Sequence, residues 1–551
     1  MARRHHALSR HLTLAALALL PVAVLSVFFV LPVSGMIARG FWPEGSFDPG
    51  GVLDVLRRPR VHRVLWFTVW SSASATALAV LLGVPTAYVL HRLRIPGRSV
   101  VRAALLVPFV LPTVVVGVAF RELFGESGPL AFLGLEGTAL GIIAALVFFN
   151  VAVVVRAVGA AWESLDRRPG EAAAALGASP WQVWWTVTLP ALRPALVSAA
   201  SVVFLFCATA FGVVLTMGGL RYATVETEIY LLTTQLLDLQ AAAALSVLQL
   251  VVVVGLLLVA ARTRATPSGG TARVTAPAQR VRVRDLPALS VASFTLLLVG
   301  LPIGTLVAGS LTVDGSWSLD NFRKLTTKGD NDALLVPVTD ALGTSLRTAF
   351  DATWISLTLG LLVAVVVTRR SRSRAERRVR GLLDGFFMLP LGVSAVTLGF
   401  GFLITLDRPP LELRDSPMLV PIAQALVALP LVVRTIVPVL AGIDDRQRQA
   451  AASLGASPLR AVLTVDVPAV WKPLLAASGF AFAASLGEFG ATSFLVREQE
   501  PTVPVVIFRL LGHPGADNYG MALAASVVLA ATTAIVMLAV ERLRVPTIGA
   551  V

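Results

Sequence analysis

The feature that most constrains this chain is a series of long apolar stretches that recurs from one end of the sequence to the other. A helix of ~20 apolar residues crosses the ~30 Å hydrocarbon core of a bilayer and satisfies its own backbone hydrogen bonds there. A soluble chain would place a charge every few residues, whereas only 14% of the 551 residues are charged. The stretches therefore predict an all-α polytopic membrane protein. Arginine far outnumbers lysine, which is typical of a GC-rich bacterial genome, so we expect a bacterial inner or plasma membrane.

The apolar stretches fall into two sets of six, which predicts about 12 transmembrane helices. The first set covers residues 12–37, 64–90, 101–120, 138–160, 192–217 and 240–261. The second set covers residues 287–310, 343–368, 382–405, 418–440, 473–495 and 519–540. Residues 262–285 are rich in Ser, Thr, Gly, Pro and Arg, which is typical of a flexible cytoplasmic linker. We expect a first domain at 1–261, with its core at 64–261, and a second at 286–551, with its core at 343–542.

The second half repeats the first half at a fixed spacing of 278 residues. The shift superimposes prolines, glycines and arginines, which chance similarity between apolar sequences does not explain. The matched pairs include Leu111-Pro112 with Leu389-Pro390, Gly177 with Gly455, Pro190 with Pro468, and Phe211-Gly212 with Phe489-Gly490. The sequence therefore predicts a duplicated six-helix unit. An even number of spans gives both copies the same orientation, as in a parallel repeat about an axis along the membrane normal.

The net charge of +14 comes largely from arginines between the apolar stretches, most densely in RRSRSRAERRVR at 369–380. This excess is typical of cytoplasmic loops and argues against a nucleic-acid-binding face. The distribution of arginine therefore predicts that both termini, the linker and residues 91–102 lie in the cytoplasm. The apolar run that follows MARRHHALSR is too long for a secretory signal, so we expect it to be the first membrane helix. A lone cysteine, Cys207, excludes an intrachain disulfide.

One predicted cytoplasmic loop in each half contains a punctuated helical segment. The two sequences are EAAAALGASPWQVWWTVTLP at 171–190 and QAAASLGASPLRAVLTVDVP at 449–468. The alanine-rich start favours a helix, and Gly177 suits the left-handed turn that ends one. Ser179 can cap a second short helix, in which Pro180 fits the first position. The second copy repeats these positions with Gly455, Ser457 and Pro458.

The second short helix carries a large apolar face. Trp181, Trp184 and Trp185 are spaced i, i+3 and i+4, so we expect them to share one face. The second copy has Leu459, Val462 and Leu463 at the same spacing. Such a face could rest on lipid headgroups. It could equally fill a groove on a partner protein. The local chemistry leaves both interpretations open.

The two segments resemble the EAA motif of ABC importer permeases. The first copy matches it with Glu171, Ala172, Ala173, Gly177, Val187, Leu189 and Pro190. The second copy matches it with Gln449, Ala450, Ala451, Gly455, Val465, Val467 and Pro468. In the second copy, Gln449 replaces the glutamate of the motif, and Val467 replaces the leucine before the proline. These two departures leave open whether the two copies are equivalent. In that family this segment is a coupling helix that docks into a groove on an ATPase subunit.

The resemblance covers nearly the whole chain, since fused double-length permeases exist for thiamine, iron(III) and aminophosphonates. It implies two tandem six-helix MetI-like units with the type I importer fold. It also implies two copies of a separate ABC ATPase, and an extracytoplasmic solute-binding protein. The chain contains no Gly-x-x-x-x-Gly-Lys-[Ser/Thr] phosphate loop. We therefore expect a transport subunit, not an enzyme, that binds no cofactor itself while its partner uses ATP.

Ionisable residues at membrane depth are candidates for the substrate pathway. Glu488 is the clearest of them, because the first half has Ala210 at the matching position. It would favour a cationic substrate, and a carboxyl group hydrogen-bonded to a neighbouring helix is the alternative. Arg156 and Arg434 recur toward the cytoplasmic ends of their spans, where snorkelling or an interhelical pair is the expected role.

Two other groups of residues are further candidates. Glu226 and Glu228 lie in a predicted outer segment that has no acids at the matching positions of the second half. They could receive a cation or pair with a docking protein, or they could form a solvated or gate-helix surface. Phe211-Gly212 and Phe489-Gly490 are expected to let helices pack closely around the pathway.

Among fused permeases, the fifth and sixth spans look most like the thiamine branch. The residues that carry this resemblance are CATAFGVVLTMGG and ATVETEIY in the first half and SLGEFGATSFL in the second. The iron(III) branch is the closest rival, and both substrates are cationic. A 12-helix secondary transporter of the major facilitator type is the alternative from another class. Its Gly-x-x-x-Asp-Arg-type signature is missing from HRLRIPGRSVVR at 91–102.

Overall fold

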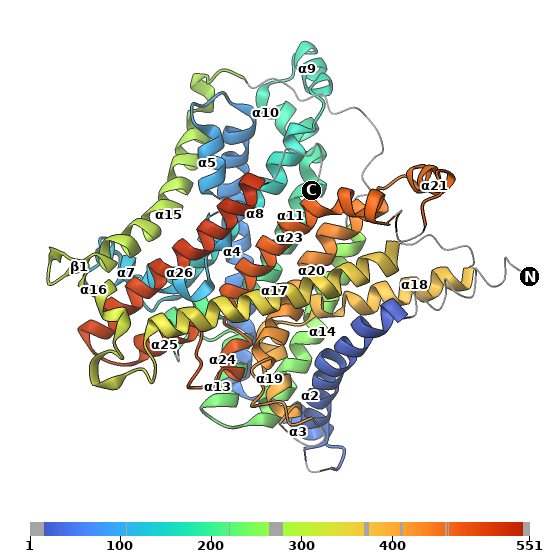
Figure 1. Ribbon diagram of the computed structural model, residues 1–551. Helices are drawn as coiled ribbons and strands as arrows, with labels where there is room; N and C mark the ends of the chain where they lie inside the picture. Colours follow the sequence, from blue (N-terminus) through green and yellow to red (C-terminus); the bar gives the residue numbers. More distant parts are fainter. Residues whose placement is uncertain are drawn as a thin grey trace, which may run out of the picture. The chain divides into compact units, whose positions relative to one another are not determined.

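A computed structural model gives the fold of the chain (Figure 1). It describes residues 16–43, 45–105, 107–219, 221–263, 279–368, 374–407, 411–457, 460 and 462–543. Within these ranges the chain is almost entirely helical. The only strands there are β1 (Thr312–Val313) and β2 (Ser316–Trp317), which pair antiparallel. The predicted all-α class is confirmed.

Ten helices in the described ranges are long and apolar enough to cross a membrane. The first half supplies Ala16–Phe41 (which includes η1, Ser26–Val30, and α2, Leu31–Phe41), Pro59–Arg92 (α4), Ala139–Glu163 (α8), Pro180–Ala208 and Leu239–Leu258 (in α14, Leu239–Thr263). The second half supplies Val283–Ser310 (η4, Val283–Asp285, and α15, Leu286–Ser310), Val338–Thr368 (α17), Leu419–Ala441 (α20), Leu463–Leu486 and Ala516–Val540 (in α26, Ala516–Leu543). These are fewer continuous spans than the 12 predicted.

The difference lies in the third predicted span of each half. Residues 101–120 are not one helix, because α5 (Arg98–Ala104) and α6 (Val107–Val110) are bent by 105° from α7 (Thr113–Phe124). Residues 382–405 are divided among α18 (Arg374–Phe387), η7 (Leu389–Gly392) and α19 (Ala395–Thr405). Pro112 and Pro390, which match in the repeat, lie at the two breaks. Proline has no backbone N–H and clashes with the preceding turn, so it interrupts an apolar run that hydropathy treats as continuous.

Short elements complete the described chain. They are α3 (Pro49–Arg57), η2 (Ala131–Leu133), α16 (Asp320–Arg323), η5 (Lys324–Thr326) and η6 (Asp330–Asp332), besides those given with the site below. Contacts divide the chain into two compact units. Unit 1 contains Met1–Leu53, Ile229–Leu250 and Phe322–Val551, and unit 2 contains Asp54–Glu228 and Val251–Asn321. Each unit therefore mixes residues of both sequence halves.

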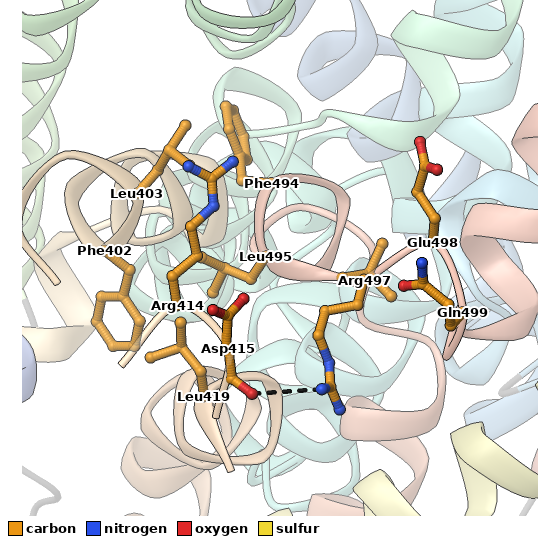
Figure 2. Close-up of a pocket in the computed structure, with 11 residues that line it drawn as sticks. Phe402, Leu403, Arg414, Asp415, Leu419, Phe494, Leu495, Arg497, Glu498 and Gln499 are labelled. Atoms are coloured by element: carbon orange, nitrogen blue, oxygen red, sulfur yellow. Dashed lines mark hydrogen bonds between the residues drawn. The ribbon is translucent and has the colours of Figure 1, made fainter. Parts of the chain in front are cut away.

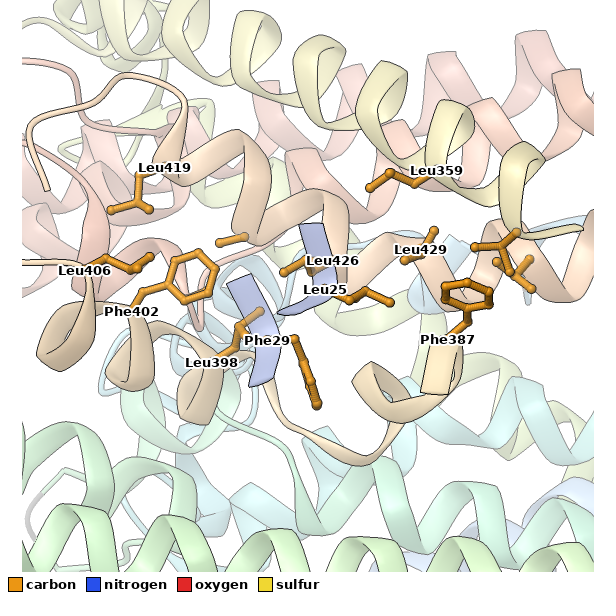
Figure 3. Close-up of a cluster of buried hydrophobic side chains, with 14 of the residues drawn as sticks. Leu25, Phe29, Leu359, Phe387, Leu398, Phe402, Leu406, Leu419, Leu426 and Leu429 are labelled. Carbon is orange, nitrogen blue, oxygen red and sulfur yellow. The ribbon is translucent and has the colours of Figure 1, made fainter. Parts of the chain in front are cut away.

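Unit 1 holds the first span of the chain among helices of the second half. Leu25 and Phe29 belong to a buried cluster with Leu398, Phe402 and residues of α17 and α20 (Figure 3). The first span also contacts α19 closely, because a Cβ placed on Gly401 would lie only 3.0 Å from Pro32. The first helix of the first half therefore packs as part of the second half.

Unit 2 shows the reciprocal arrangement. α15, the first helix of the second half, packs against α4 and α7 of the first half. The Thr86 hydroxyl donates to Thr295 Oγ1 at 3.1 Å, and the Tyr88 hydroxyl donates to Asp285 at 2.9 Å. Backbone hydrogen bonds at 2.8 Å join Gln279 to Arg92 and Arg94. The first helix of each half therefore packs against helices of the other half.

The central helix pair of each half is built in the same way. α4 packs on α8 in unit 2, and α17 packs on α20 in unit 1. A Cβ on Gly83 would lie 2.7 Å from Val154, and a Cβ on Gly360 would lie 2.5 Å from Val432. Any larger residue would force the helices apart, so glycine at both positions permits the close crossing. The repeat detected in the sequence is therefore a repeat of packing as well.

Candidate functional site

The first predicted cytoplasmic segment folds as two short helices joined by a glycine turn. α9 (Arg168–Ala175) has Glu171 in its first turn, where a carboxylate favours the helix N-terminus. Three N–H groups close its last turn at 3.0 Å, from Leu176 to Ala172 O, from Gly177 to Ala174 O and from Ala178 to Ala173 O. Gly177 has a φ of +87°. The predicted left-handed turn is confirmed, and its hydrogen bonds are those of a Schellman motif.

Ser179 begins the second short helix, α10 (Pro180–Val183). Its hydroxyl accepts from the Gln182 N–H at 3.3 Å, and its own N–H donates to the Gln182 side chain at 2.8 Å. Pro180 occupies the first turn. The predicted cap and proline are confirmed, and the reciprocal bond with Gln182 makes a capping box. A π-helix, η3 (Trp184–Thr188), then continues into α11 (Leu189–Ala208).

The three tryptophans do not share one face, contrary to the prediction. Trp181 and Trp185 are exposed and pack edge to face, with ring centroids 5.5 Å apart. Trp184 instead packs on Trp162 at the end of α8, with ring centroids 5.6 Å apart. Trp184 and Trp185 are successive residues, so their side chains lie about 100° apart around the helix, and only Trp185 stays beside Trp181. Only Trp181 and Trp185 form an exposed aromatic surface.

The second segment has the same backbone. α21 (Asp445–Ser453) is followed by Gly455, which has a φ of +80°. The N–H groups of Leu454 and Ala456 donate at 3.0 Å to the carbonyls of Ala450 and Ala451. These two bonds match the bonds that Leu176 and Ala178 make in the first copy. The helix–glycine turn is therefore a shared feature of both halves, as the repeat predicted.

Side chains distinguish the second segment from the first. Ser457 accepts from the Arg460 N–H at 3.3 Å, and Gln449 is exposed on α21. Arg448 donates to Asp466 at 2.8 Å and so ties α21 to η8 (Val462–Asp466). The first copy has Gly170 and Thr188 at these two positions. Pro458 and Leu459 lie outside the described residues.

Each glycine turn presents a leucine that the sequence analysis did not single out. Leu176 and Leu454 match in the repeat, and each is 89% exposed. The same exposed apolar side chain therefore occurs beside the glycine turn in both halves. The signal in the sequence was the leucine that immediately precedes each turn glycine, but within a helical run it suggests burial.

Each half breaks its fifth span at a Phe-Gly pair. The pair Phe211-Gly212 leads into α12 (Gly212–Gly218), and Phe489-Gly490 leads toward α24 (Thr492–Leu495). The expected spans 192–217 and 473–495 therefore end early, at Ala208 and Leu486.

The glycine of each pair allows a close approach between helices. A Cβ on the first glycine would lie 3.1 Å from the backbone N of Val114, and one on the second would lie 3.2 Å from that of Val396. These contacts confirm the predicted close packing at both pairs. Their place on a substrate pathway stays a prediction.

Glu488 is buried, and its carboxylate binds its own loop. It accepts from the N–H groups of Ala491 at 2.8 Å and Thr492 at 3.0 Å, and from the Thr492 hydroxyl at 2.5 Å. The Gln424 amide donates to the same hydroxyl at 3.3 Å. The carboxylate thus caps the start of α24, instead of bonding directly to a neighbouring helix. Its role for a substrate stays a prediction.

Glu226 and Glu228 are both buried, so the solvated-surface interpretation is wrong. They lie at the start of α13 (Val225–Thr234). Arg60 of α4 binds the Glu228 carboxylate through both oxygens, at 2.6 and 2.9 Å. The matching residue in the second half is Val506, which is also buried. The carboxylate of Glu228 therefore forms an internal ion pair in the first half that the second half, with Val506 at this position, does not have.

The comparisons with known proteins agree with the repeat. The family described as "Binding-protein-dependent transport system inner membrane component" matches the chain twice, over residues 75–266 and 356–544. The thiamine transport system permease protein ThiP of Brucella abortus (strain 2308) is 28% identical over 535 residues, which cover 94% of each chain. ThiP of Escherichia coli (strain K12) is 27% identical over 82% of this chain and 83% of that protein. The molybdenum transport system permease protein ModB of Mycobacterium bovis is 35% identical over 46% of this chain and 96% of that protein.

Proposed function

This chain belongs to the family of inner membrane components of binding-protein-dependent transport systems, and we propose that it forms the membrane pathway through which an ATP-driven importer carries thiamine. The proposal that the substrate is thiamine rests on the similarity to a thiamine permease over 94% of both chains. The molybdenum permease, although more similar locally, covers only 46% of this chain. Thiamine is a cation with two aromatic rings joined by a methylene group, so the pathway must accept a positive charge within the membrane.

The energy for transport comes from two copies of a separate ATPase, because the chain has no phosphate loop. Each copy docks on one of the two helix–glycine–helix segments. Support comes from the paired backbone turns at Gly177 and Gly455 and from the leucine exposed beside each one. Burying one exposed leucine in a docking surface contributes about 1.5–3 kcal/mol of binding energy.

The proposed orientation follows from charge and from the repeat. Both termini, the linker at 262–285 and the two docking segments face the cytoplasm, where arginine-rich loops belong. The opposite side receives an extracytoplasmic solute-binding protein that delivers thiamine. Each docking segment continues through a π-helix into a spanning helix, α11 or α23 (Val467–Leu486), with no intervening loop. A movement of the ATPase is therefore passed directly to a membrane helix.

Uptake of labelled thiamine tests this proposal. The chain is expressed with its ATPase and binding protein in cells that have lost their own thiamine permease. We expect uptake against a gradient that stops when the catalytic glutamate of the ATPase is replaced. A complex that imports ferric ion or molybdate under the same conditions, and no thiamine, would overturn the substrate and leave the family intact.

A further inference from the structure

Four aromatic rings form a continuous cluster within unit 1. Tyr230 of α13 contacts Phe494 of α24, with ring centroids 5.4 Å apart and planes at 80°. Tyr230 also meets Phe508 of α25 (Val503–Gly512) edge to face at 6.5 Å, and Phe508 meets Phe489 at 5.5 Å. Phe489 is buried, whereas the other three rings are only partly buried. The cluster therefore joins α13, which comes from the first half, to α24 and α25, which come from the second.

Tyr230 and Phe508 are equivalent residues, since they lie 278 positions apart in the repeat. Their helices are also held equivalently. The Val225 N–H at the start of α13 donates to the Thr68 hydroxyl at 3.0 Å, and the Val503 N–H at the start of α25 donates to the Ser345 hydroxyl at 2.8 Å. Two equivalent residues that touch each other must lie at the axis relating their helices. In transporters built from repeats, the substrate site lies at the interface of the repeats.

A cavity of 260 Å³ adjoins the cluster on one side (Figure 2). Phe494 and Leu495 supply part of its apolar wall, while Arg414, Asp415 and Arg497 supply polar groups. Figure 2 shows the Arg497 side chain directed at Asp415, whose backbone oxygen it binds at 3.3 Å. Phe494 therefore belongs both to the wall of a polar cavity and to the ring cluster. Tyr230 is not part of that wall and contacts it through Phe494.

From these positions we propose that Tyr230 and Phe508 form the closed constriction of the pathway and that their ring faces contact the cation as it passes. The substrate class rests on the proposed function. Edge-to-face contact fills the space at the axis, so a solute must separate the two rings. A positively charged aromatic ring replaces the lost ring–ring contact with two cation–π contacts, which an uncharged ring of the same shape cannot make. The constriction would therefore favour aromatic cations over neutral analogues.

The first test removes the rings and keeps the apolar bulk. Tyr230→Leu and Phe508→Leu should each slow thiamine uptake by roughly 2- to 30-fold, the range of a single cation–π contact, and the double variant should be slower still. Tyr230→Phe should retain most of the rate. Phe28→Leu is the matched control, because Phe28 is a partly buried ring paired with Phe402 at 5.9 Å in the same unit.

An uncharged thiamine analogue, with carbon in place of the thiazolium nitrogen, separates a cation contact from a packing defect. Its uptake should be slow in the wild type and change little in the leucine variants. Equal losses for thiamine and the analogue would overturn the cation contact. So would leucine variants that import thiamine at the wild-type rate.

The second test does not depend on the substrate being thiamine. Tyr230→Cys and Phe508→Cys are combined in the full chain and joined by a short, reducible bis-thiosulfonate reagent. Cys207 is fully buried and should not react. We expect cross-linking to abolish uptake of the solute that the wild type imports, and reductant to restore it. Complete cross-linking with unchanged uptake would overturn the proposal that these residues form the constriction. If the wild type imports another solute, only the proposal that the substrate is thiamine would be overturned.

Discussion

The two halves of this chain share their backbone turns and glycine contacts but differ in their buried charges. Both end the first helix of the docking segment at a left-handed glycine, and both cross their central helices at a glycine. The first half alone has the ion pair between Arg60 and Glu228, and the second half alone has the capping carboxylate of Glu488. The two halves therefore share their backbone geometry, while the buried polar groups are specific to each half.

The ion pair of the first half offers the largest effect. Arg60→Leu leaves the buried carboxylate of Glu228 without its partner, which should destabilise the protein by about 3–5 kcal/mol. Thermal unfolding of the purified chain in detergent measures this loss. Adding Glu228→Val should recover most of the stability, because the first half then resembles the second, which has Val506 there. A double variant as unstable as the single one would show that the charge itself is required.

The exposed leucines test whether the two docking segments are equal. Leu176→Ala and Leu454→Ala should each weaken ATPase association by about 1.5–3 kcal/mol, the value of burying one leucine, and leave unfolding unchanged because each is 89% exposed. Co-purification with the ATPase measures the association. Leu335→Ala, at another exposed leucine, is the control. A loss at Leu176 alone would show that only the first segment binds tightly, whereas no loss at either would exclude both leucines from the interface.

The carboxylate of the second half should give the smallest free-energy effect of the three. Glu488→Gln keeps one acceptor oxygen for the start of α24, so we expect unfolding to shift by no more than about 1 kcal/mol. If the charge also attracts the cation, thiamine uptake should slow while ATPase assembly stays intact. Uptake at the wild-type rate would limit Glu488 to its capping role and remove it from the pathway.

Local features of the fold could be predicted from the sequence, because neighbouring residues determine them. Gly177, Ser179 and Pro180 specified their turn and helix start without help from the rest of the chain. The breaks near Pro112 and Pro390 were missed because hydropathy measures the transfer of side chains to lipid and not the continuity of backbone hydrogen bonds.

Features of the site that join distant residues could not be predicted in this way. Arg60 and Glu228 are 168 residues apart, and only the tertiary fold brings them together. The same holds for Tyr230 and Phe508, whose equivalence was readable from the repeat but whose contact was not. The exposure of Leu176 was also hidden, because an apolar residue in a helical run is normally buried.

The exchange of first helices between the halves has a consequence for synthesis. The first span, Ala16–Phe41, packs against α19, which begins at Ala395. At a synthesis rate of 5–20 residues per second, the ribosome needs roughly 20–70 s to reach that partner. During this interval the first span lacks α19 as a neighbour, although α14, which it also contacts near Gly40, is made earlier. The apolar surface that later packs against α19 therefore has to be compatible with two environments in succession, first the bilayer and then the protein.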